Sequence, residues 1–195
     1  PHSLQTLLSA IEIAEDPATE KKIIPSTYPG ADEFTDRVFS PRMQRLRSLG
    51  KLFEYLGILY TNMNNGQRSL TYHLMAEKLA KENNAMHLLT TIYITLARNY
   101  LSLKNPDSAL VAIQKAYDVS RQLGYKRYEG SILLNMGRVY SLQGKKELAI
   151  HYFKVAMSVS DEQSYYRGVA ASNLALSDLY KQSGQIDSVI HYAKE

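Results

Sequence analysis

Three charged residues follow one another at intervals of forty and are the first candidates for binding chemistry: Arg98, Arg138 and Asp178. If they lie on neighbouring helices, Arg98 and Arg138 would be roughly 10 Å apart. Two such guanidinium groups can receive a carboxylate or another acidic group through charge-assisted hydrogen bonds, and Asn135 could add a donor. Alternatively, Arg138 pairs with Asp178 while Arg98 is solvated, an arrangement worth ~0–1 kcal/mol at an exposed site. Both interpretations remain open from the sequence.

Other groupings of reactive residues do not predict chemistry. His151 and His191 are also forty apart, but helices about 10 Å apart would not bring two imidazoles to the ~2 Å that zinc requires. The adjacent Asp32 and Glu33 have no defined mutual geometry for acid and base roles. We find neither a nucleophile with a base nor a glycine-rich phosphate loop. The sequence therefore predicts no catalytic residue, no metal and no cofactor.

Charge and composition exclude several further classes of partner. The chain has 195 residues, of which 45% are hydrophobic, so it is long and apolar enough to bury a core. Its formal net charge is +4, and because it contains no cysteine it forms no disulfide. The basic run from Arg42 to Lys51 covers little more than two helical turns without an aromatic platform, so we expect no nucleic acid partner. No stretch approaches the roughly 20 apolar residues that span a bilayer. Because the chain begins with Pro1 and ends inside an expected helix, we expect it to be part of a longer protein.

A forty-residue repeat organises most of the chain. Tyrosine recurs at Tyr60, Tyr100, Tyr140 and Tyr180, and three residues before each tyrosine stands a small residue: Gly57, Ala97, Gly137 or Ser177. A fixed period of this kind is typical of a solenoid. We predict units at 50–89, 90–129 and 130–169, and a truncated unit at 170–195.

Each unit is predicted to be a helical hairpin, because residues that favour turns divide it. These are Asn64-Asn65-Gly66, Asn105-Pro106, Gly144 and Gly184. The small residues would let the two helices of a hairpin approach closely, while the tyrosines and Phe153 are expected to fill the space between hairpins.

Residues 1–49 do not follow the repeat. Leu4, Leu7, Leu8 and Ile11 form a helical stripe that ends near Asp16-Pro17, Pro25, Pro29 and Gly30 then predict an irregular connection, and Ser40-Pro41 predict the start of the next helix. The first helix either caps the first hairpin or occupies a binding groove from which a ligand displaces it.

The third unit resembles the tetratricopeptide repeat in its residue types and spacing: Leu133, Met136, Gly137, Tyr140, Ala149, Phe153 and Ala156. It departs from that pattern in Asp161, which replaces a proline, and in a period of forty rather than thirty-four. The resemblance covers residues 50–195 and implies an all-α, right-handed superhelix of stacked hairpins. It also implies that a second stripe on the first helix of each unit, about 100 degrees from the packing stripe, lines a concave groove.

In that groove an apolar row would alternate with a charged row, which suits a peptide. The candidate site residues are Glu54, Ile58, Ile94, Arg98, Leu134, Asn135, Arg138, Leu174 and Asp178. The lysine and asparagine clamp of chaperone-binding members is not reproduced, so chaperone binding is not predicted.

Forty-residue variants of this repeat are similar to those in peptide-pheromone receptors and in sensor portions of bacterial histidine kinases and transcriptional regulators. The resemblance therefore implies a peptide- or protein-binding module in a larger signalling protein, with no catalysis of its own, and acidic segments are among the expected ligands. A sensor domain of this kind would favour the periplasm, and an adaptor the cytoplasm. The alternative is a structural scaffold that associates with a second copy through Val189, Ile190 and Ala193 at the C-terminal edge.

Overall fold

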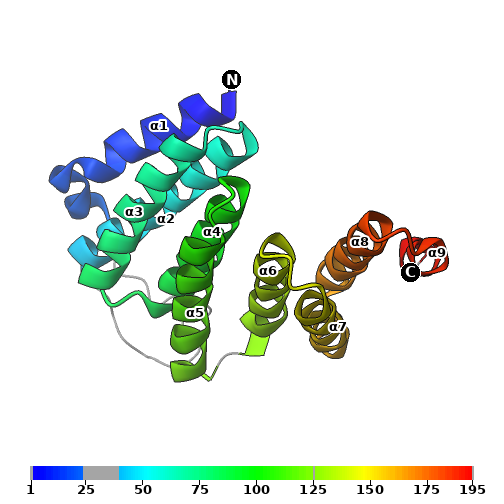
Figure 1. The fold of residues 1–195 in the computed structure, drawn as a ribbon. Helices are drawn as coiled ribbons and strands as arrows, with labels where there is room; N and C mark the ends of the chain where they lie inside the picture. The colour runs from blue at the N-terminus through cyan, green and yellow to red at the C-terminus, as the bar shows by residue number, and fades with distance from the viewer. Residues whose placement is uncertain (1, 24–39, 125, 195) are drawn as a thin grey trace. The chain divides into compact units, whose positions relative to one another are not determined.

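The fold is known from a computed structural model, which describes residues 2–23, 40–124 and 126–194. Every regular element in these ranges is helical, which confirms the all-α prediction (Figure 1). The elements are α1 (His2–Glu15), the 3₁₀ helix η1 (Pro17–Lys22), α2 (Pro41–Asn62), α3 (Gly66–Glu82), α4 (Met86–Ser102), α5 (Pro106–Gln122), the 3₁₀ helix η2 (Lys126–Tyr128), α6 (Glu129–Leu142), α7 (Lys146–Glu162), α8 (Tyr166–Gln182) and α9 (Ile186–Lys194). The predicted irregular connection with Pro25, Pro29 and Gly30, and the Asp32–Glu33 pair, lie outside the described residues.

Side-chain caps start several helices where the sequence predicted them. The Ser40 hydroxyl accepts a hydrogen bond from the Met43 amide at 3.3 Å, and Pro41 is the first residue of α2. The carboxamides of Asn65 and Asn105 cap α3 and α5 in the same way. Each cap satisfies an amide that has no partner inside its helix, so the turn residues determine where the hairpins begin.

The chain divides into two compact units, residues 1–95 and 96–195, and the division falls inside α4. In unit 1, α1 packs against α2, and α2 packs against α3. In unit 2, α6 packs against α5 and α7, α7 against α8, and α8 against α9, while α6 also contacts α8. This sequential packing is the pattern that stacked helical hairpins produce.

Arg45 fastens the N-terminal segment to α2. Its Nε donates to a carboxylate oxygen of Glu20 at 2.9 Å, and its Nη1 donates to the carbonyl of Ala14 at 2.9 Å. The guanidinium thus binds both the C-terminal end of α1, where carbonyls lack helical partners, and η1. Of the two interpretations of the N-terminal helix, these contacts support the capping of the first hairpin.

Glycine brings the two helices of a hairpin together in both units. A Cβ atom added at Gly137 would lie 2.5 Å from the ring of Phe153, and one added at Gly57 would lie 2.6 Å from the ring of His73. Such distances leave no room for a side chain larger than hydrogen. The predicted role of these two small residues is therefore confirmed.

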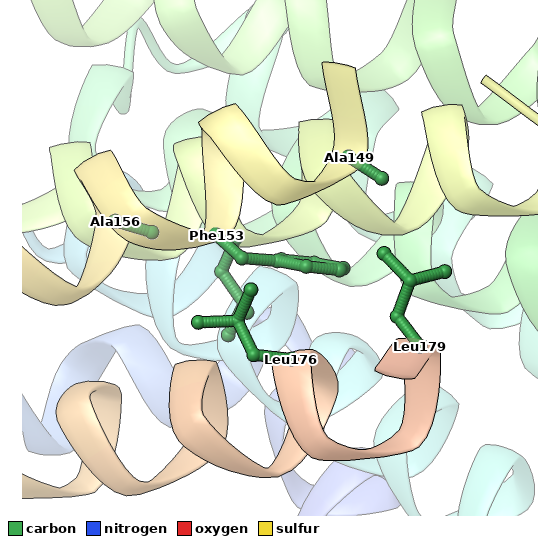
Figure 2. Close-up of a cluster of buried hydrophobic side chains, with 6 residues drawn as sticks. Ala149, Phe153, Ala156, Leu176 and Leu179 are labelled. Atoms are coloured by element: carbon green, nitrogen blue, oxygen red, sulfur yellow. The ribbon is translucent and has the colours of Figure 1, made fainter. Parts of the chain in front are cut away.

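The buried cluster of unit 2 joins one hairpin to the next. It consists of Leu134, Ala149, Phe153, Ala156, Leu176 and Leu179, from α6, α7 and α8 (Figure 2). Figure 2 shows the ring of Phe153 between Ala149 and Ala156 of its own helix and Leu176 and Leu179 of α8. Phe153 thus fills the space between hairpins, as predicted.

The repeat tyrosines pack differently from the prediction. Three of them stack on a second tyrosine twelve residues later, inside their own hairpin: Tyr60 on Tyr72, Tyr140 on Tyr152 and Tyr180 on Tyr192, with ring centroids 5.4, 5.2 and 5.6 Å apart. The prediction that the repeat tyrosines pack between hairpins is therefore wrong for these three, because each stacks on a tyrosine of the second helix of its own hairpin.

Candidate ligand-binding site

The predicted stripe falls into two parts that belong to different units. Unit 1 carries Glu54 and Ile58 on α2 and Ile94 on α4. Unit 2 carries Arg98 near the end of α4, then Leu134, Asn135 and Arg138 on α6, and Leu174 and Asp178 on α8. Spacings of three and four residues place the members on α6, and likewise those on α8, on one face of their helix.

The apolar row of the predicted groove is mostly closed. Ile94 is 9% exposed and Leu134 is 7% exposed, whereas Leu174 is 64% exposed. Leu134 belongs to the buried cluster that includes Leu176 and Leu179 of the following helix. The expectation of an accessible apolar row is therefore wrong at residues 94 and 134, because packing uses these side chains.

Arg138 is half-buried on α6, and within the described residues it has neither a hydrogen bond nor an ion pair. Burial lowers the pKa of Arg138, and the charge of Arg98 lowers it further. Arg98 is exposed and belongs to the same unit. The like charge of Arg98 therefore opposes the charged form of Arg138, and among the described residues no ion pair joins Arg138 to Asp178.

Asn135 differs from its predicted role as a donor. Its side chain is 2% exposed, and its amide nitrogen donates to the carbonyl of Ser131 at 2.8 Å, one turn earlier on α6. The Asn135 Oδ1 atom is buried and lacks a hydrogen-bond partner. The atom of Asn135 that lacks a partner is therefore a hydrogen-bond acceptor, and it is buried. Asn135 and Arg138 are three residues apart on α6.

A second buried amide was missed by the sequence analysis. Asn173 on α8 is 3% exposed, and its Oδ1 atom also lacks a partner. At intervals of forty, the same repeat position is occupied by Phe53, Tyr93 and Leu133. The sequence could therefore have indicated Asn173, because it is an amide at a repeat position that is otherwise aromatic or aliphatic.

The part of the stripe in unit 1 contains a buried acidic side chain, Glu54, and a half-buried apolar one, Ile58. Glu54 is 7% exposed, and burial raises its pKa, while a hydrogen bond from Thr91 and the charge of Lys51 act in the opposite direction. Ile58 is half-buried. In unit 1 this stripe therefore carries a buried carboxyl group whose ionisation is disfavoured by burial.

The described ranges contain neither a cluster of metal ligands nor a helix that could span a membrane. No three histidine, aspartate or glutamate side chains there come close enough to form a metal site. No helix in those ranges is long and apolar enough to cross a membrane. His151 and His191 instead pack edge-on against the neighbouring rings of Tyr152 and Tyr192.

The geometry of unit 2 can be compared with that of known proteins. A family model described as tetratricopeptide repeat matches residues 88–162. Over these residues the chain is similar to the tetratricopeptide repeat family. The repeats include α6 and α7 with Gly137 and Phe153, and they carry Arg98, Asn135 and Arg138.

One curated relative matches part of the chain. It is the response regulator aspartate phosphatase H of Bacillus subtilis (strain 168), 27% identical over 93 residues. The match spans 47% of this chain and 25% of the relative, so the matched residues correspond to about a quarter of that protein.

Three solved structures share the fold. Aspartyl phosphate phosphatase F from Bacillus subtilis gives a TM-score of 0.66 at 21% identity, over 97% of this chain and 50% of that one. A signal transduction ATPase with a tetratricopeptide repeat sensor, PH0952 from Pyrococcus horikoshii, gives a TM-score of 0.62 at 19% identity, over 96% of this chain and 28% of that one. BtubC (BKLC) from P. vanneervenii gives a TM-score of 0.62 at 15% identity, over 98% of this chain and 87% of that one. At these identities the likeness is one of fold.

Proposed function

We propose that this chain is a peptide- or protein-binding module, and that it forms the sensing or interaction part of a larger bacterial signalling protein such as a histidine kinase or transcriptional regulator. The observation that carries the proposal is the half-buried Arg138, which has no ion pair among the described residues and whose charged form the like charge of Arg98 opposes. The curated relative named as a response regulator phosphatase and the solved protein named for its repeat sensor support a signalling setting.

The unpaired Arg138 favours an anionic ligand. A guanidinium that loses water without gaining a partner is destabilised, and the second guanidinium of Arg98 adds repulsion. A carboxylate placed between the two groups would relieve both costs through charge-assisted hydrogen bonds. An acidic ligand would thus offset the electrostatic cost of these two positive charges.

A peptide-binding measurement tests this function. Fluorescein-labelled random decapeptides would be screened against the full chain, and the best binders titrated by fluorescence anisotropy. We expect acidic peptides to be selected and Arg98→Ala with Arg138→Ala to weaken binding by about 10-fold or more. The control is Lys154→Ala with Arg167→Ala, which removes two exposed positive charges of the same unit and should change affinity less than about 2-fold. Failure to find any binder, or unchanged affinity in the double arginine variant, would contradict the proposal.

A second candidate function, scaffolding by self-association, has one observation in its favour. On the last two helices, Leu174 is 64% exposed and Ile190 is 47% exposed. The predicted edge residues Val189 and Ala193 are half-buried and exposed, respectively. Sedimentation velocity over a 100-fold concentration range would show a dimer that Leu174→Ser with Ile190→Ser abolishes; a monomer throughout would leave only the peptide-binding function.

A further inference from the structure

We propose that the ligand is a dipolar extended peptide, in which an acidic residue bound by Arg98 and Arg138 is followed or preceded, three residues away, by a basic residue bound by Asp178. This inference rests on the proposed function and specifies its ligand. The acidic residue meets the two guanidinium groups described above. The basic residue meets a carboxylate on the next first helix of the repeats.

Asp178 is open for such a contact. It lies on α8, forty residues after Arg138, and α8 packs directly against α6. The side chain of Asp178 is exposed and forms no ion pair with another described residue. Neighbouring helices therefore present opposite charges that do not neutralise each other.

The distance between these helices determines the spacing in the ligand. Packed helices have axes about 8–10 Å apart. A polyproline II strand advances about 3.1 Å per residue with three residues per turn, so residues i and i+3 project from one side about 9 Å apart. A regular β-strand would place residues i and i+3 on opposite sides. The extended peptide that fits both charges is thus of the polyproline II type.

The surroundings of Asp178 favour a long basic side chain. Leu174 is one turn earlier on the same face of α8 and is 64% exposed. The aliphatic stem of a lysine or arginine can cover Leu174 while its charged end reaches Asp178. Lys181, exposed one turn later, carries the opposing charge and should weaken this preference.

Paired decapeptides test the inference on the full chain. Each labelled peptide carries one glutamate, and lysine or glutamate is placed two, three or four residues from it, in both chain directions. Lysine three residues away should bind roughly 3- to 10-fold tighter than glutamate at the same position, and the preference should be smaller at the other spacings. Asp178→Lys should reverse the preference, Asp178→Asn should abolish it and Lys181→Ala should widen it. The matched control Asp187→Lys makes the same charge change at an exposed position of α9 and should leave it unchanged.

The outcomes separate this inference from the function on which it rests. If peptides bind through Arg98 and Arg138 but Asp178→Lys leaves the ratio of lysine to glutamate affinities unchanged, the dipolar ligand is wrong and peptide binding stands. A preference for spacing two or four would also overturn the inference. If the decapeptides do not bind, or bind equally to the double arginine variant, the proposed function fails and the inference fails with it.

Discussion

The two compact units use the same helical hairpins but treat their charged side chains differently. In unit 1 the carboxylate of Glu77 accepts a hydrogen bond from the Tyr93 hydroxyl at 3.1 Å and forms an ion pair with Lys81 at 2.6 Å. Arg45 is paired with Glu20 at 2.9 Å, although its side chain is only 10% exposed. These groups stabilise the unit that contains them.

In unit 2 comparable groups are left open. Arg138 has no ion pair within the described residues, and buried amide oxygens of Asn135 and Asn173 have no hydrogen-bond partner. The sequence follows the same division: of 23 basic and 19 acidic residues, unit 2 contains thirteen and nine, and unit 1 contains ten of each, so the net charge of +4 belongs to unit 2. The comparison teaches that periodic packing specifies the hairpins, while the pairing of polar groups distinguishes a structural region from a candidate binding region.

The largest expected effect comes from the same substitution in the two units. Arg45→Met removes hydrogen bonds to Glu20 and to the carbonyl of Ala14, so we expect a loss of about 2 kcal/mol in the free energy of unfolding. Arg138→Met removes a half-buried charge that has no partner, so stability should change by less than about 0.5 kcal/mol or increase. Urea unfolding of the full chain, followed by circular dichroism, measures both.

Hydrogen exchange assigns each effect to its unit. Peptides from α1 and α2 should exchange faster in Arg45→Met, and peptides from α6 should be unchanged in Arg138→Met. Arg45→Lys keeps the charge but loses the forked geometry, and it should recover only part of the loss. If Arg45→Met and Arg138→Met destabilised the chain equally, the distinction between a paired arginine in unit 1 and an unpaired one in unit 2 would be wrong.

A smaller effect is expected from the buried carboxylate of unit 1. Because burial raises the pKa of Glu54, its contribution to stability is complete below the ordinary value of 4.5 and is lost as pH rises through the raised value. Glu54→Gln removes this loss, so the variant should gain stability relative to the parent chain between about pH 4 and pH 7. Thermal unfolding of the parent chain and of Glu54→Gln at several pH values measures this gain; a difference independent of pH would contradict the assignment.

The sequence predicted what local chemistry determines. Ser40 and Asn105 cap helices as expected, and Gly137 admits the ring of Phe153, because each role depends on a residue type at a fixed offset. Spacing could not determine whether a stripe position faces solvent. Ile94 was expected to line a groove and is buried, a difference that depends on how neighbouring helices pack.

The candidate site was less predictable for the same reason. The effect of the Arg98 charge on Arg138 agrees with their spacing, but spacing could not tell whether Arg138 forms an ion pair with Asp178. The open atom of Asn135 is its oxygen rather than a donor, because its nitrogen bonds to its own helix. Side-chain choices of this kind are decided by three-dimensional competition between partners, which residue spacing does not record.

The smallest expected effect concerns the turns. Lys104 and Ser164 in unit 2 have φ values of 55° and 53°, and Asn64 in unit 1 has 56°. Left-handed backbone costs most side chains about 1–2 kcal/mol, but asparagine tolerates it and glycine has no such cost. Lys104→Gly and Ser164→Gly should each stabilise the chain by about 0.5–1 kcal/mol in urea unfolding, whereas Asn64→Gly should change stability by less than about 0.5 kcal/mol. An equal gain at all three positions would show that asparagine provides no local compensation, and that the turns of unit 1 are as strained as those of unit 2.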